Sequence, residues 1–215
     1  MKGLIIKDIC LLKSQKNTMP VFLLLMLWFV LMDNISFVFI YMGMMAALLA
    51  CGTLSYDEFD RGYSFLFTLP FERREYVRSK FLLGFALFAA GALAACLLVW
   101  AAGLIKGNPM PAEDAALSIF SAFLTCALIL SVMIPMRIRF GSEQGRIVVF
   151  AVFAGLAALV FAAVKLLPPS FTEGLYSFSQ ANGLLVIIFG LVVPIAVIIL
   201  IGYALSIKII NKKEF

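Results

Sequence analysis

Apolar residues fall into six long runs, and the polar segments between the runs are short. The runs cover residues 18–32, 35–54, 81–105, 115–136, 147–166 and 183–207, and they are almost free of charged residues. A hydrocarbon core about 30 Å thick is spanned by about 20 apolar residues of helix. The first run, residues 18–32, is shorter than this length, so we expect flanking residues to extend its helix across the membrane. The pattern predicts an all-α integral membrane protein with six transmembrane helices.

The basic residues indicate how these helices are oriented. If the amino terminus is inside, 15 of the 17 Lys and Arg residues fall in inner segments, and only Lys106 and Lys165 fall outside. Cytoplasmic loops carry such an excess of Lys and Arg. We therefore expect both termini in the cytoplasm. Basic loops facing an anionic leaflet explain the net charge of +5, so no nucleic-acid partner is expected.

Composition narrows the possible function classes. The chain is 64% hydrophobic and only 13% charged, which leaves no polar segment long enough for a separate soluble domain. We expect one transmembrane domain over residues 1–215. The chain has no histidine, none of its four cysteines stands at CxxC spacing, and no GxxxxGK[ST] or GxGxxG motif occurs. The sequence therefore predicts no catalytic residues, no metal site and no cofactor bound by this chain.

The polar segments divide the domain. Residues 1–17 mix Leu and Ile with lysines, which suits a helix lying in the headgroup region. An ordinary charged leader to the first span fits the same residues. Spans one and two follow at 18–54, with Asp33-Asn34 in an outer turn between them. A cytoplasmic segment is expected at 55–80, spans three and four at 81–136, a polar loop at 137–146, and spans five and six at 147–207.

The segment 55–80, SYDEFDRGYSFLFTLPFERREYVRSK, is the longest inner loop. Acidic residues close the second span, an aromatic-rich apolar stretch follows, and Pro70 stops it. Residues 72–80 are typical of a charged helix start that leads into the third span. A short apolar helix flanked by charges of both signs suits docking into a groove on another protein. It equally suits lying on the lipid surface.

Three features together point to a known family. They are the leader KDICLLK, the short first hairpin broken by Asp33-Asn34, and SYDE…TLPFERREYVRSKFL between spans two and three. With them the chain resembles the small six-span permeases of bacterial type-2 ABC transporters. The positions that match the family pattern are Thr68, Leu69, Pro70, Phe71, Arg73, Tyr76, Val77, Lys80 and Phe81. Phe71 stands where a smaller valine is common. The resemblance rests on residues 1–105, and beyond them it is one of topology and hydropathy only.

The resemblance implies a machine of several subunits in the bacterial plasma membrane. Two permease chains, identical or paired with a sister chain, form the pathway, and each engages a separate cytoplasmic ATPase that binds ATP and Mg²⁺. Residues 1–17 then correspond to an amphipathic elbow helix, and the cytoplasmic segment between spans two and three to the coupling helix. The ATPase-coupling interface implied in this way comprises Tyr56, Asp57, Glu58, Asp60, Arg61, Tyr63, Phe65, Phe67, Leu69, Pro70, Arg73 and Arg74.

The charged residues near this interface can be interpreted in two ways. The acidic residues either form ion pairs or are a solvated cap at the end of a helix. We expect Asp57, Glu58 and Asp60 to pair with the ATPase or with Arg73 and Arg74. The basic residues Arg73, Arg74, Arg78 and Lys80 are interpreted mainly as positive anchors at the inner membrane surface.

The apolar character of the spans bears on the substrate. No ionisable group falls near the centre of a span, which argues against a proton-coupled transporter. A permease of an ABC exporter for a hydrophobic or amphipathic substrate is expected, such as an antimicrobial peptide, a toxin or a lipid-like molecule. The alternative is a non-transporting membrane immunity or sensor protein that sequesters an amphipathic peptide.

Overall fold

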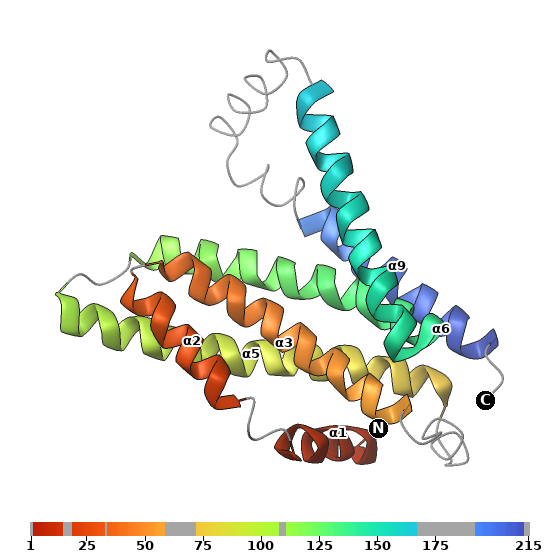
Figure 1. The fold of residues 1–215 in the computed structure, drawn as a ribbon. Helices are drawn as coiled ribbons and strands as arrows, with labels where there is room; N and C mark the ends of the chain where they lie inside the picture. The colour runs from red at the N-terminus through yellow and green to blue at the C-terminus, as the bar shows by residue number, and fades with distance from the viewer. Residues whose placement is uncertain are drawn as a thin grey trace.

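The computed structural model describes residues 2–14, 19–32, 34–58, 72–107, 111–166 and 192–212. Within these ranges every regular element is a helix, as the all-α prediction requires, and no strand is present (Figure 1). The helices are α1 (Lys2–Ser14), α2 (Met19–Leu31), α3 (Ile35–Glu58), α5 (Arg73–Lys106), α6 (Ala112–Leu166) and α9 (Val193–Lys212).

Four helical segments in the described part of the chain are long and apolar enough to cross a membrane: Ile35–Glu58, Arg73–Lys106, Ala112–Gly141 and Ile195–Lys212. They overlap the second, third, fourth and sixth expected spans, although the last helix continues to Lys212, beyond the expected end at 207. The apolar helix of the first expected span, Pro20–Leu31, is shorter. The described part of the chain therefore contains four candidate spans, while the count of six and the cytoplasmic placement of the termini stay predictions.

Helix α5 is much longer than its apolar run. Its 34 residues extend over about 51 Å at 1.5 Å per residue, against about 30 Å of hydrocarbon. The excess lies mainly at the amino-terminal end, where residues 73–80 form the first two turns of the same helix. The charged helix start expected at 72–80 is therefore confirmed, and it is continuous with the span.

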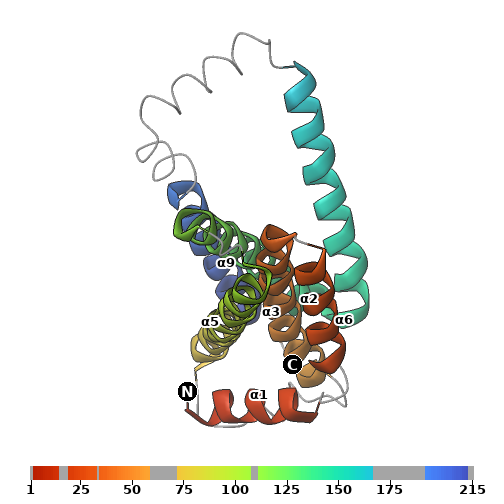
Figure 2. The same cartoon turned by 90° about the vertical axis from the view of Figure 1, so that its left-hand side faces the viewer.

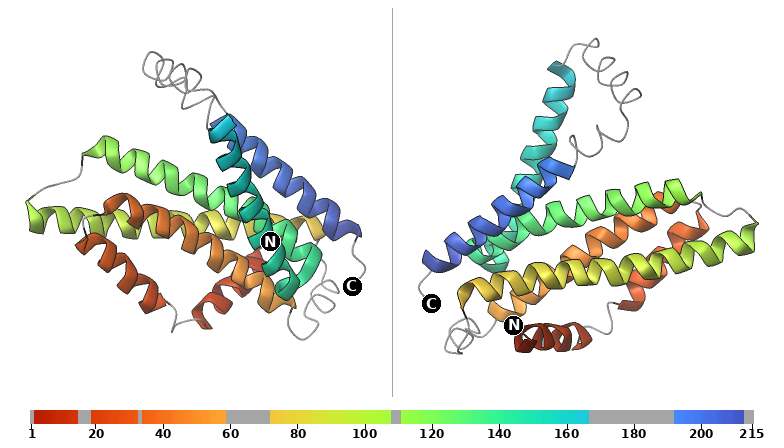
Figure 3. Two further views of the ribbon diagram at one scale, coloured as in Figure 1. Left: turned by 45° about the horizontal axis from the view of Figure 1, so that its top comes forward. Right: turned by 180° about the vertical axis from the view of Figure 1, so that it is seen from behind.

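Helix α3 occupies the middle of the bundle and packs against α5 and α6, while α9 packs mainly against α6 (Figures 1 and 3). Helices α3 and α6 both bury small residues, among them Ala47 and Cys51 in α3 and Ala122 and Cys126 in α6. Gly43 is required there, because a Cβ at this position would collide with the backbone carbonyl of Ala122. Small residues let helix backbones approach closely in a membrane.

In place of the polar loop expected at 137–146, the structure has a single kink within that segment. Two helical parts, residues 112–140 and 142–166, meet across a kink at Gly141, with φ 79° and ψ −178°. Arg, Glu and Gln are good helix formers, so polarity alone does not end a helix here. A positive φ is accessible to glycine at little cost. Beyond Gly141 the helix turns away from α3 and α5 (Figures 1 and 2). The fifth expected span falls in this second part, many of whose side chains lie outside the described residues.

The close approach at Gly43 can be tested against a matched glycine. G43A places a methyl group against backbone atoms of Ala122, and we expect it to destabilise the fold by about 1–3 kcal/mol. G91A meets only the terminal methyl group of the flexible Met42 side chain. We expect it to be neutral or stabilising, because alanine favours a helix over glycine by about 1 kcal/mol. Thermal unfolding of both variants in detergent measures the difference, and equal stabilities would contradict the packing described.

Candidate functional site

Helix α1 lies across one end of the bundle, beside the end of α3 and the beginning of α5 (Figures 1 and 2). Leu4, Asp8 and Leu12 are spaced four residues apart, so they share one face of α1. All three are buried, and Asp8 is only 1% exposed. A carboxylate in the middle of a buried stripe needs a cation and hydrogen-bond donors.

Lys80 of α5 supplies that cation. Its Nζ lies 2.8 Å from Oδ1 of Asp8 and 2.7 Å from Oδ2 of Asp57 in α3. It also donates a hydrogen bond of 2.9 Å to Oγ1 of Thr53. The side chain of Lys80 is 1% exposed. The ammonium group thus makes two hydrogen bonds, to Asp8 and Thr53, and a further ion pair with Asp57.

Asp57 is the second centre of the cluster. Besides Lys80, it accepts hydrogen bonds from Nζ of Lys7 and, at 2.9 Å, from the hydroxyl of the buried Tyr76. Lys7 also lies 3.5 Å from Asp8, and its side chain is 33% exposed. The ammonium of Lys80 lies 5.2 Å from the centre of the Tyr76 ring, within the range of a cation–π contact. We call Lys7, Asp8, Thr53, Asp57, Tyr76 and Lys80 the charge cluster.

The charge cluster is electrically balanced, because it contains two lysines and two aspartates. Burying charged groups is costly unless they are paired and hydrogen-bonded, and removing one partner then leaves the other unpaired. One acceptor is left over: Oδ2 of Asp8 is buried and has no hydrogen-bond partner within the described part of the chain. The arrangement therefore tolerates little displacement of α1, α3 or α5 relative to one another.

The position of the charge cluster connects it to the predicted coupling segment. Residues 59–71 lie outside the described residues, but both of their flanks are described. Asp57 stands in the last turn of α3, just before this stretch, while Tyr76 and Lys80 stand in the first turns of α5, just after it. The two ends of the segment are therefore tied to each other and to α1.

Two arginines attach further helices to the same end of the bundle. Arg137 of α6 donates to the carbonyl of Cys51 at 2.7 Å and to the hydroxyl of Ser55, both in α3. Arg73 donates to the carbonyls of Ile210 at 2.8 Å and Asn211 at 3.2 Å, at the end of α9. Terminal carbonyls of a helix lack partners within the helix, so Arg73 caps α9.

Five of the twelve residues predicted for the coupling interface are described. Tyr56 and Arg74 are exposed, Glu58 and Arg73 are half-buried, and Asp57 is buried. The other seven lie outside the described residues: Asp60, Arg61, Tyr63, Phe65, Phe67, Leu69 and Pro70. Whether any of the twelve contacts an ATPase stays a prediction.

Two sequence interpretations change with this geometry. Asp57 pairs with Lys7 and Lys80, and not with Arg73 or Arg74. The interpretation of Lys80 as a surface anchor is wrong, because the side chain is buried and its charge is used inside the protein. Asp8 escaped sequence reasoning altogether. Its spacing of four residues from both Leu4 and Leu12 was the signal that could have placed it on the buried face.

The charge cluster predicts a large effect for loss of its central cation. K80M leaves Asp8 and Asp57 buried without it, so we expect a loss of about 3–5 kcal/mol in the free energy of unfolding. The double variant D8N/K80M should recover part of this loss, because it restores the balance of charge. R78Q, at an exposed position two residues away, should change stability by less than about 0.5 kcal/mol. Thermal unfolding in detergent tests all three, and a fully stable K80M would refute the assignment.

Comparison with known proteins identifies the chain at the level of its family. The model of a family described as ABC-2 family transporter protein matches residues 3–211. No curated protein and no solved structure showed significant similarity. The match covers almost the entire sequence, including both flanks of the coupling segment and all members of the charge cluster. The chain therefore belongs to the ABC-2 transporter family and is a multi-pass protein of the plasma membrane.

Proposed function

We propose that this chain is the permease subunit of an ABC exporter, which provides the pathway for a hydrophobic or amphipathic substrate. A separate cytoplasmic ATPase subunit binds ATP and Mg²⁺ and drives transport. Membership of the ABC-2 transporter family shows a permease role in general. The ATPase partner, a second permease copy or sister chain, and the class of substrate are parts of the proposal.

The charge cluster carries the proposed coupling mechanism. A force on residues 59–71 reaches the bundle through α3 and α5, whose ends are joined by Asp57, Tyr76 and Lys80. Because these bonds are short and buried, the two ends move together and take α1 with them. A partner can change the state of a protein only through contacts that differ between the two states. Lys80 and Asp57 act here as positioning residues that keep the segment in one place relative to the pathway.

Residues beside the segment are candidates for direct contact with the ATPase. Tyr56, in the last turns of α3, is 51% exposed, and Arg74, in the first turn of α5, is also exposed. An exposed aromatic and an exposed arginine are the residue types most enriched at protein interfaces. Together with the segment itself, they form the surface that we assign to the partner.

An apolar hollow supports the proposed substrate class. It has a volume of about 200 Å³ and lies between α2, α3 and α5. All of its lining residues are apolar: Phe22, Leu23, Met26, Met42, Met45, Ala46, Leu49, Leu87, Ala90 and Gly91. Methionine side chains adapt to irregular shapes. A hydrophobic peptide, toxin or lipid-like molecule is therefore easier to accommodate than a sugar or an ion.

Co-purification tests the ATPase partner. The wild-type chain, extracted from native membranes, should retain a cytoplasmic ABC ATPase, and R74E should reduce the amount recovered. R78E is the matched control, because Arg78 is also exposed and lies one turn further along α5. Transport of an amphipathic peptide should require ATP hydrolysis by the retained subunit. Peptide binding without any co-purified ATPase would instead support an immunity or sensor protein.

Coupling is tested separately from assembly. Y76F removes the hydrogen bond to Asp57 and keeps the aromatic ring, so the complex with the ATPase should still form. We expect peptide-stimulated ATP hydrolysis to fall by about tenfold, which corresponds to about 1.4 kcal/mol. This is near the lower end of the range for a hydrogen bond to a charged group. Full stimulation in Y76F would remove the charge cluster from the mechanism and leave the ATPase partner untouched.

A further inference from the structure

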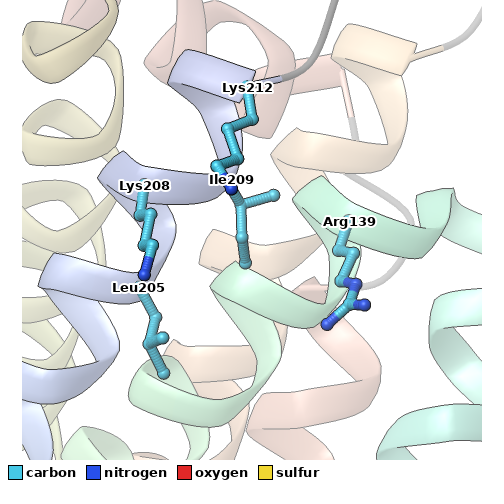
Figure 4. Close-up of a pocket in the computed structure, with 5 residues that line it drawn as sticks. All are labelled: Arg139, Leu205, Lys208, Ile209 and Lys212. Atoms are coloured by element: carbon cyan, nitrogen blue, oxygen red, sulfur yellow. The ribbon is translucent and has the colours of Figure 1, made fainter.

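A second group of charges lies at the same end of the bundle, outside the charge cluster. Arg139 of α6 and Leu205, Lys208, Ile209 and Lys212 of α9 line a hollow of about 480 Å³ (Figure 4). The four α9 residues follow the spacing i, i+3, i+4, i+7, so they share one face of that helix. The lining thus combines three cations with two aliphatic side chains and contains no acidic residue.

Among the described residues, the three cations, Arg139, Lys208 and Lys212, remain available for a ligand. No ion pair joins Arg139, Lys208 or Lys212 to an acidic side chain in the described part of the chain. The guanidinium of Arg139 lies 5.1 Å from the ring centre of its neighbour Phe140, which leaves its N–H donors available. The last carbonyls of α9 are bonded by Arg73, so the two lysines are not needed to cap this helix.

Along α9 the lining begins with the aliphatic Leu205 and ends with the basic Lys212, and Lys208 and Ile209 lie between them. Leu205 and Lys212 are seven residues apart, which corresponds to about 10 Å along the helix axis. The aliphatic Leu205, 46% exposed, therefore lies furthest from the end of α9 among the four residues, and the positive charge of Lys212 lies at that end. Basic hollows between transmembrane helices are suited to anionic lipid headgroups.

We propose that this hollow binds the headgroup of an anionic phospholipid from the leaflet at this end of the bundle. Lys208, Lys212 and Arg139 surround the phosphate, and Leu205 and Ile209 contact the glycerol and the first acyl carbons. A free phosphate would use the three cations but would leave the aliphatic side chains without a role. This binding is independent of the proposed transport function.

Lipid retention measured by native mass spectrometry tests the proposal. The wild-type chain, released from nanodiscs of equal parts phosphatidylglycerol and phosphatidylcholine, should retain phosphatidylglycerol preferentially. Each cation near an anionic headgroup contributes roughly a fivefold preference. K208Q/K212Q should therefore lower the preference about 25-fold. K13Q/R78Q removes the same charge from exposed positions elsewhere and should leave it unchanged. An equal loss in both double variants would mean general surface attraction and would overturn the site.

Two further experiments distinguish a bound lipid from a bound soluble phosphate. Glycerol phosphate at millimolar concentration should not displace phosphatidylglycerol from the wild-type chain, whereas efficient displacement would assign the hollow to a soluble anion and refute a lipid site. L205N should weaken retention of phosphatidylglycerol, because it removes the aliphatic contact. Unchanged retention in L205N would also count against a bound lipid. All substituted positions are exposed, and thermal unfolding confirms that each variant is folded.

Discussion

The ammonium group of Lys80 is the point at which three distant parts of the chain meet, since its donors reach Asp8, Thr53 and Asp57. Helix α1 buries only a narrow stripe, with Leu4 and Leu12 on either side of Asp8. Apolar contact alone would hold such a short transverse helix weakly. The ion pair gives it a defined position, because a charge in a medium of low polarity strongly favours its partner. The end of α3 and the start of α5 are positioned by the same group.

The rest of the bundle obeys a different constraint. Lipid tails are as apolar as leucine, so burial of apolar surface does little to bring helices together inside a membrane. Close packing of small residues holds α3 and α6 together instead. The absence of a side chain at Gly43 lets the backbone of Ala122 lie in direct contact with α3. The molecule thus combines close steric contact along the spans with directional polar bonds at one end. The polar bonds are concentrated where the predicted coupling segment leaves and rejoins the bundle.

The sequence predicted four of the long apolar helices and missed the polar contacts, for physical reasons. Apolar runs place α3, α5 and α9 because the length of a span is dictated by the thickness of the bilayer. Polarity at 137–146 predicted a loop, yet those residues favour helix and a single glycine at 141 suffices to redirect it. Counting basic residues orients a membrane protein without identifying their partners. Lys80 was therefore mistaken for a surface residue, although Asp8 lies 72 positions away and only folding brings it close.

Glu58 and Gly141 are separated by 83 positions, yet they occupy a single site. A Cβ at position 141 would overlap the carboxylate of Glu58, so the redirected backbone of α6 leans directly on the last residue of α3. The direction of α6 beyond Gly141 consequently depends on a residue that has both a positive φ and no Cβ. A side chain larger than that of glycine at position 141 would therefore press on the end of α3, next to Asp57 of the charge cluster.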